Sequence, residues 1–362
     1  MMEQFNIFQE MYPTFKFNKP TIMLFEAFAG IGSQAKALRR LSKELGFYLD
    51  VIGISEIDSY AIKSYEAVHG RVFNYGDIAK IKKLPNTIDI FTYSFPCQDI
   101  SLAGHKKGLT KGSGTRSGLL WEVERLLLNS SKPKVLLMEN VSALVSENHI
   151  EDFKKWLIEL EKLGYTTYWE RLNAKDYGVA QNRDRVFAVS ILGEYNYDFP
   201  KPFPLKSKVR DILEESVDKR FYLSDKAVKG MLNTTYATGK FENRVLDQEG
   251  ISSTLCARDY KDPKCIVVGT LDMKGNDQIR RVYSKDGISP TLTASEGGHR
   301  QPKFLEGKKV RKLTPREYWR LMGFSDQDFE KAAKVCSNSQ LYKQAGNSIV
   351  VDVLYYVFKN LF

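Results

Sequence analysis

Short apolar runs alternate with longer amphipathic stretches between Thr21 and about Leu192. In each amphipathic stretch the apolar positions recur every three or four residues, which is the spacing of one helix face. The apolar runs cover residues 22–28, 51–56, 88–93, 135–138 and 186–191, and the amphipathic stretches cover residues 34–45, 60–68, 119–128 and 149–163. Strands that alternate with helices predict an α/β fold with a doubly wound sheet.

The pattern changes at residues 197–204. Pro200, Pro202 and Pro204 stand there within five residues, and proline continues neither a helix nor a central strand, so we predict a linker. The chain beyond it is rich in Gly, Thr and Lys and repeats the motif RVxxxxGISxTL at residues 244–255 and 281–292. Two copies are too few for a solenoid and fit two similar hairpin-like units of a β-rich domain.

The two ends of the chain complete this division. Residues 1–20 show no clear period and form either a packed or a loose arm, whereas Gln344 is expected to open an apolar amphipathic helix that packs back on the first domain. We therefore predict a domain from residues 1–197 plus 335–362 and a smaller one from residues 198–334.

Composition places the chain among globular proteins. It has 362 residues, 43% hydrophobic and 27% charged, which is enough for a sizeable core and two domains. No apolar run approaches 18 residues and the start lacks the layout of a signal peptide, so a cytoplasmic protein is the expectation. The four cysteines form no CxxC pair, which predicts neither a metal site nor a disulfide framework.

The net charge is +10, and it is uneven. Residues 200–334 hold 27 Lys and Arg against 19 Asp and Glu, an excess of eight. A basic domain of this kind indicates a polyanion partner, although a solvated basic surface is the plainer alternative.

A glycine-rich turn is expected at residues 28–32, between the first strand and the first helix. Gly30 and Gly32 suit a turn in which the backbone approaches a ligand closely. Glu56, which ends the second strand, and Asp77 in Gly76-Asp77-Ile78 are placed to accept hydrogen bonds from a ribose and an adenine. These features suit NAD and S-adenosylmethionine equally, and a tight turn without a ligand is the alternative.

A candidate nucleophile lies beyond the third predicted strand. Cys97 stands between Pro96 and Gln98, and Lys106, Lys107, Lys111 and Arg116 make the next loop electropositive, which favours a thiolate. A buried, inert cysteine is the alternative. Glu139 ends the strand of residues 135–138, where open α/β sheets bind ligands, and Arg183 and Arg185 precede the next strand and are placed to hold Glu139 or a phosphate.

Taken in order, these blocks resemble those of the bacterial DNA (cytosine-5)-methyltransferase family over nearly all of residues 21–362. The blocks are FEAFAGIGS, SEID, GDI, FPCQ, MENV, QNRDR, RKLTPREYWRLMGF and QAGNSIVV. The resemblance implies a Rossmann-like methyltransferase domain with a smaller β-rich target-recognition domain. It places the nucleophile at Cys97, the base-holding acid at Glu139 and supporting arginines at Arg183 and Arg185, and it gives Arg316 a structural role.

The resemblance also implies S-adenosylmethionine as the cofactor. Its binding residues would be Phe28, Ala29, Gly30, Ile31, Gly32, Glu56, Ile57, Asp77, Ile78, Pro96, Leu119, Asn347 and Ser348. The chain departs from the family at Glu26, where Asp is usual, at Ser33, where Gly is usual, and at Asp184, where Glu is usual. We expect the changes at Glu26 and Ser33 not to disable the enzyme, Glu26 to point away from the ligand, and Asp184 to be structural.

The implied reaction methylates carbon 5 of a cytosine that is flipped out of duplex DNA. We predict that the two copies of the repeated motif flank the recognition surface. Segments 256–280 and 293–303 would carry the DNA-binding candidates Arg258, Lys261, Lys264, Arg300 and Gln301, and residues 224–243 are the alternative location. The expected setting is a restriction–modification system or a phage or host protection system, with a cognate endonuclease outside this chain and a monomeric enzyme.

Three other functions compete with this interpretation. An RNA methyltransferase of the same fold would carry Pro-Pro-Cys-Gln in place of Phe95-Pro96-Cys97-Gln98 and a smaller recognition domain. An NAD-dependent dehydrogenase agrees only with the GxGxx(G/A) match at residues 30–35, which is a weak signal by itself. A DNA-binding relic without catalysis would not need both Cys97 and Glu139.

Overall fold

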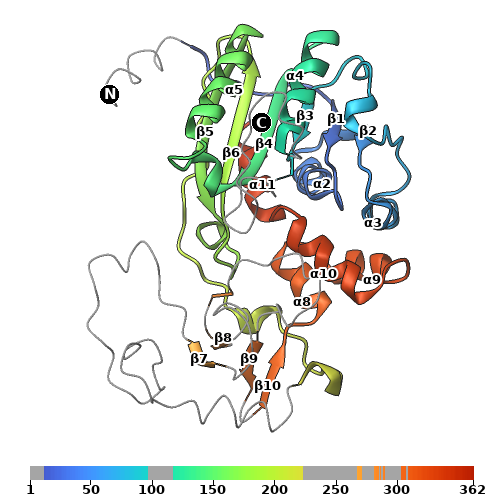
Figure 1. Ribbon diagram of the computed structural model, residues 1–362, viewed down its shortest axis with the longest axis vertical. Helices are drawn as coiled ribbons and strands as arrows, with labels where there is room; N and C mark the ends of the chain where they lie inside the picture. The colour runs from blue at the N-terminus through green and yellow to red at the C-terminus, as the bar shows by residue number, and fades with distance from the viewer. Residues whose placement is uncertain are drawn as a thin grey trace, which may run out of the picture.

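The computed structural model describes residues 12–96, 117–222, 267–270, 281–284, 286, 288–289, 303–306 and 309–362. These residues form a six-stranded and a four-stranded sheet. Figure 1 shows the six-stranded sheet in the upper half of the molecule, the four-stranded sheet in the lower half, and helices α8 and α10 between them. Within the described ranges, no helix is both long enough and apolar enough to cross a membrane.

The large sheet has the strand order β2-β1-β3-β4-β6-β5. Its strands are β1 (Thr21–Ala27), β2 (Tyr48–Ser55), β3 (Ile90–Tyr93), β4 (Val135–Val141), β5 (Tyr165–Asn173) and β6 (Asp184–Leu192). The first four are parallel, and β6 runs antiparallel to both β4 and β5. All five predicted strands are confirmed. Strand β5 was not predicted, because this edge strand carries exposed charged positions instead of an apolar run.

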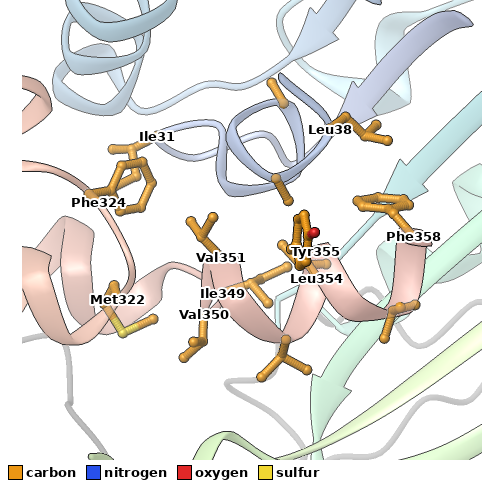
Figure 2. Packing of buried hydrophobic residues seen from close by; sticks show 14 of the residues in the cluster. Ile31, Leu38, Met322, Phe324, Ile349, Val350, Val351, Leu354, Tyr355 and Phe358 are labelled. Carbon is orange, nitrogen blue, oxygen red and sulfur yellow. The ribbon is translucent and has the colours of Figure 1, made fainter. Parts of the chain in front are cut away.

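Helices cover both faces of this sheet. They are α2 (Ser33–Leu45), α3 (Ser59–His69), α4 (Leu120–Asn129), α5 (Ile150–Lys162) and α11 (Val351–Lys359). Consecutive strand residues point to opposite faces, and Leu24 accordingly joins the core that α2 and α11 cover, whereas Phe25 joins the core of α4 and α5. Figure 2 shows Leu354, Tyr355 and Phe358 of α11 facing the helix that carries Leu38. The predicted doubly wound arrangement is confirmed.

The C-terminal prediction needs one correction. Gln344 does not open a helix but lies inside α10 (Asn338–Asn347), and a separate helix, α11, begins at Val351. Between them Ser348 and Val350 have extended backbone, with ψ angles of 169° and 117°. Gly346 and Asn347 have low helix propensity, and the β-branched run of residues 349–351 favours extended backbone. The predicted return of this segment to the first domain is confirmed, since α11 packs against α2.

Helices α8 (Pro315–Leu321) and α9 (Asp326–Ala333) precede this segment. A capping box begins α8, in which the Thr314 hydroxyl accepts from the Glu317 N–H while the Glu317 carboxylate accepts from the Thr314 N–H. Trp319 and Phe324 belong to the same core as Ile31 and Leu38, and Figure 2 shows Phe324 beside Ile31. The predicted division into residues 1–197 plus 335–362 and residues 198–334 stays a prediction.

The small sheet consists of β7 (Val267–Thr270), β8 (Arg281–Ser284), β9 (Lys303–Glu306) and β10 (Lys309–Lys312), in the order β10-β9-β8-β7. Strand β8 pairs antiparallel with β7 and parallel with β9. The second copy of the repeated motif begins in β8, and the first copy lies outside the described residues. Short 3-10 turns connect the larger elements: η1 (Ile78–Lys80), η2 (Ser117–Leu119), η3 (Ser142–Val145), η4 (Ala174–Tyr177), η5 (Val209–Ile212) and η6 (Lys219–Phe221).

The described part of the N-terminal arm is packed. The backbone N–H of Phe15 donates to the Asn196 carbonyl at 3.0 Å, and that of Phe17 donates to the Leu361 carbonyl at 2.7 Å. The proline-rich linker is also held, because the Phe203 ring packs against Tyr177 and Tyr356. The arm and the linker therefore both lie on the α/β domain.

Candidate active site

The turn between β1 and α2 is built for a close approach between backbone and ligand. Phe28, Gly30 and Gly32 have positive φ angles of 56°, 55° and 78°, a region that glycine enters freely and that phenylalanine rarely adopts. A Cβ atom at Gly30 would meet no protein atom within 4 Å, whereas one at Gly32 would lie 2.5 Å from the His69 ring. Gly30 thus leaves a side-chain-sized space at the turn, and Gly32 is packed tightly against α3.

The Glu56 carboxylate lies against this turn at the carboxyl end of β2. It accepts hydrogen bonds from the backbone N–H groups of Gly30, Ile57 and Asp58, each at 2.8 Å. Ile57 is 75% exposed and presents an apolar surface beside that carboxylate. Asp77 caps η1 by accepting from the Ala79 N–H at 3.0 Å.

The remaining predicted cofactor residues come from three other elements. Pro96 lies just beyond β3, Leu119 ends η2, and Asn347 and Ser348 close α10. The Ile349 N–H donates to the Ser33 hydroxyl at 3.3 Å, so the end of α10 lies against the first residue of α2. Buried Ala29, Ile31 and Ile78 support the turn and η1 from inside.

These residues fit S-adenosylmethionine. The Glu56 carboxylate is fixed by backbone donors and keeps acceptor capacity for ribose hydroxyls. The exposed Ile57 side chain suits the apolar face of an adenine, and the space at Gly30 admits a ligand close to the backbone.

Glu26 lies beneath the same turn. It is fully buried, and its carboxylate accepts from the Ala35 N–H at 3.0 Å and from the Tyr65 hydroxyl at 2.5 Å. Burial raises the pKa of Glu26 to about 7, against the opposing effects of the Tyr65 and Ala35 hydrogen bonds and the Arg39 charge. The expectation that it points away from the ligand agrees with these bonds, which turn its carboxylate toward α2 and α3.

Glu139 lies at the same edge of the sheet, near the carboxyl end of β4. It is 8% exposed, and its carboxylate is 3.3 Å from the Nε of Arg185 on the adjacent strand β6. Burial raises the pKa of this carboxyl, and the charges of Arg185 and then Arg183 oppose that rise. A raised pKa favours the protonated form, which can donate a hydrogen bond.

Next to Glu139, Asn140 fixes the loop that leads to Cys97. Its side-chain amide donates to the Phe95 carbonyl at 3.0 Å, in a buried environment. Cys97 itself lies outside the described residues, as do the DNA-binding candidates Arg258, Lys261, Lys264, Arg300 and Gln301. The loop is therefore fixed to β4 at Phe95, two residues before Cys97.

The QNRDR block and the residue before it contact Ser289, which follows β8, and helix α8. The N–H of Asn182 donates to the Ser289 carbonyl and the N–H of Ser289 donates to the Ala180 carbonyl, both at 2.7 Å. The side-chain amide of Gln181 donates to the Leu321 carbonyl of α8 at 3.1 Å. Arg183 is buried and donates to the carbonyls of Gly346 at 3.1 Å and Ser348 at 2.7 Å.

One residue of this region and one local signal were not predicted from the sequence. Tyr65, which holds Glu26, is an ordinary apolar position of a helix, and nothing in the sequence marks its hydroxyl. The start of α8 was missed although Thr314-Pro315-Arg316-Glu317 has the capping-box pattern with a proline in the first helical position. Arg316, expected to be structural, forms ion pairs with Glu214, Asp326 and Glu330.

Known proteins match this chain over almost its whole length. The family model for C-5 cytosine-specific DNA methylases matches residues 22–362. The chain is 37% identical to the type II methyltransferase M2.ScrFI of Lactococcus lactis subsp. cremoris, over 94% of this chain and 99% of that protein. It is 31% identical to the orphan methyltransferase M.SPBetaI of Bacillus phage SPbeta, over 94% and 97% of the two chains.

Solved structures share the fold at lower identity. The methyltransferase EhMeth of Entamoeba histolytica has a TM-score of 0.68 at 17% identity, over 95% of this chain and 98% of that one. The Dnmt2 methyltransferase of S. pombe has a TM-score of 0.65 at 18% identity, over 94% and 98%. The dehydrogenase alternative is therefore wrong. The chain belongs to the C-5 cytosine-specific DNA methylase family, and it is a DNA (cytosine-5)-methyltransferase that uses S-adenosylmethionine.

Proposed function

We propose that the enzyme methylates cytosine within a specific duplex sequence through a covalent bond between Cys97 and the base, with Glu139 as the acid that holds the base. One observation supports this assignment above the others. Glu139 is a buried carboxyl paired with Arg185 at the sheet edge, and its neighbour Asn140 binds the Phe95 carbonyl of the loop that continues to Cys97.

The first step makes carbon 5 reactive. The Cys97 thiolate forms a bond to carbon 6 of the flipped cytosine, and the π electron pair of the C5=C6 double bond becomes available at carbon 5. The Glu139 carboxyl gives its proton to ring nitrogen 3, which removes the negative charge that would otherwise build up on the ring. A buried carboxyl with a raised pKa is suited to this donation.

When bound, S-adenosylmethionine would supply an electrophilic methyl group to carbon 5, and the sulfur–methyl bond would break with its electrons returning to the cofactor sulfur. A water then removes the carbon-5 proton, the Sγ–C6 bond breaks with its electrons returning to sulfur, and nitrogen 3 returns its proton to Glu139. The residues that would hold the cofactor are Phe28, Ala29, Gly30, Ile31, Gly32, Glu56, Ile57, Asp77, Ile78, Pro96, Leu119, Asn347 and Ser348.

We also propose that residues 198–334 read the DNA, with Arg258, Lys261, Lys264, Arg300 and Gln301 at the interface. The bonds between Ser289 and residues 180–182 support a fixed link from this region to the QNRDR block. Both a type II and an orphan phage enzyme are among the relatives, so the proposed setting is restriction–modification or phage DNA protection, with or without a cognate endonuclease. We further propose that the enzyme is a monomer and acts in the cytoplasm, where DNA and S-adenosylmethionine are both present.

A duplex pool made with 5-fluorocytosine tests the covalent step. Fluorine replaces the carbon-5 proton, so elimination is blocked and the wild-type enzyme with S-adenosylmethionine should stay attached to DNA on a denaturing gel. Cys97→Ser should give no adduct, because a hydroxyl is a far weaker nucleophile at neutral pH. Cys336→Ser is the matched control, since Cys336 contacts Ser64 and the Tyr60 carbonyl, away from β4.

An adduct in Cys97→Ser, or none in the wild type, would refute the Cys97 assignment. Bisulfite sequencing of DNA from cells that express the wild-type chain gives the second measurement. A single methylated sequence context supports sequence-specific recognition, and methylation without any context contradicts it.

A further inference from the structure

The junction between α10 and α11 is held from three sides. The Arg183 guanidinium donates to the Gly346 and Ser348 carbonyls at 3.1 and 2.7 Å. The Ile349 N–H donates to the Ser33 hydroxyl at 3.3 Å, and the Val351 N–H donates to the Met322 carbonyl at 3.0 Å. An extended segment between two helices is thereby fixed in one position.

Arg183 and Arg185 are two residues apart, but their guanidinium groups contact different elements of the protein. The Nε of Arg185 approaches the Glu139 carboxylate, whereas Arg183 places its charged group on the carbonyls that end α10. Arg183 is 4% exposed, and hydrogen bonds from a buried guanidinium are stronger than those between neutral groups. The charges of both arginines lower the pKa of Glu139, as expected, but this role does not explain the Arg183 bonds to Gly346 and Ser348.

Ser33 holds the same junction from the side of the cofactor turn. It is the first residue of α2, comes directly after Gly32, and is 2% exposed. A glycine at this position would offer no hydroxyl for the Ile349 N–H. The serine of this chain therefore adds a direct bond between the turn and the end of α10.

We propose that Arg183 and Ser33 are positioning residues for the cofactor. They fix Asn347 and Ser348 against the turn of residues 28–32, so that the two sides of the pocket keep their spacing before the cofactor arrives. This inference rests on the assignment of these two segments to the cofactor pocket. It makes the arginine pair a link between the two substrates, with Arg185 toward the base and Arg183 toward the cofactor.

The test is calorimetric titration of S-adenosylhomocysteine, without DNA, into folded variants. Arg183→Met should raise the Kd at least about tenfold, the size expected for losing hydrogen bonds from a charged group. Arg183→Lys should recover part of this loss, because an ammonium group supplies donors without the planar fork. Ser33→Ala should raise the Kd about threefold, as fits the loss of one long neutral bond.

Two matched controls separate positioning from general damage. Ser42→Ala removes a hydroxyl from the same helix that donates only locally, to the Arg39 carbonyl, and should leave the Kd within about twofold of wild type. Arg185→Lys should also keep the Kd within about twofold while it lowers methyl transfer. Thermal unfolding identifies variants that do not fold. If Arg183→Met is one of them, the Kd values of Arg183→Lys and Ser33→Ala test the proposal.

The outcomes are distinguishable. If folded Arg183 variants and Ser33→Ala bind S-adenosylhomocysteine as tightly as wild type, the positioning role is wrong. If Arg185→Lys weakens binding as much as Arg183→Lys does, the division of labour between the two arginines is wrong. If the wild-type chain itself does not bind S-adenosylhomocysteine, the pocket assignment fails instead, and the 5-fluorocytosine experiment still reports on Cys97.

Discussion

Two buried glutamates lie at the same edge of the sheet, but their carboxylates differ in the hydrogen bonds that they accept. Glu26 of β1 is fully buried, and both of its carboxylate oxygens accept hydrogen bonds, from the Ala35 N–H and the Tyr65 hydroxyl. Glu139 of β4 retains 8% exposure and, among the described residues, pairs with the Arg185 side chain and accepts no hydrogen bond. Burial raises the pKa of both carboxyls.

The difference separates a carboxyl that holds the protein together from one that can take up a ligand. The donors around Glu26 belong to the protein and come from α2 and α3, so this carboxyl fixes the underside of the cofactor turn. Glu139 retains acceptor and donor capacity that no described residue uses, which a base can engage. A raised pKa alone would not have told the two apart, because structural groups show the same shift.

The largest effect is expected from Glu139→Gln. We expect methyl transfer to fall about 10²-fold or more, because an amide cannot give its proton to ring nitrogen 3. The Kd for S-adenosylhomocysteine should change less than about twofold, since the role proposed for Glu139 is to hold the base. Single-turnover kinetics and calorimetry measure the two quantities, and a large loss of cofactor affinity would move Glu139 to the cofactor pocket.

The sequence predicted the glycine turn, Glu56 and Glu139 because each of them lies at the end of a recognisable strand. Residues 22–28, 51–56 and 135–138 are compact apolar runs, and parallel strands bring the residues at their carboxyl ends to one edge of the sheet. The direction of β6 could not be predicted, because the side-chain pattern of a strand is the same in both directions. Strand β5 was missed because it has no apolar run. The role of Arg183 was equally invisible, since it depends on carbonyls more than 160 residues away.

A second prediction uses the pH dependence of stability. The pKa of Glu26 is raised from 4.5 to about 7 in the folded state, so the folded protein binds this proton more tightly than the unfolded chain. The stabilisation is complete below about pH 4.5 and is lost as the pH rises through 7. Between pH 5.5 and 8, the free energy of unfolding of wild type should fall by about 2 kcal/mol relative to Glu26→Gln.

Urea unfolding of both proteins at matched pH values measures this difference. Glu26→Gln keeps the shape of a protonated carboxyl, so its own curve serves as the control for all other titrating groups. Parallel curves for the two proteins across this range would show that Glu26 does not titrate there. In Glu139→Gln, the change in unfolding free energy with pH that Glu26 causes should remain as in wild type.

The smallest effect is expected from Tyr65→Phe, which removes the hydroxyl that donates to Glu26. The free energy of unfolding should fall by about 1 kcal/mol at pH 8, where the carboxylate is ionised, and by less at pH 5.5. Tyr48→Phe is the control, because Tyr48 is 67% exposed and should change stability little at either pH. A loss of equal size at both pH values would mean that the Tyr65 hydroxyl acts independently of the Glu26 charge.

The packing of α11 on α2 sets an order for folding during protein synthesis. Beyond the apolar contacts of Figure 2, Arg40 pairs with Asp352 at 2.6 Å and Glu44 pairs with Lys359 at 2.7 Å, across more than 300 residues of chain. A ribosome therefore produces β1 to β6 long before the helix that covers α2 exists. Until then one apolar face of the nascent domain is uncovered, which exposes it to aggregation and to chaperone binding.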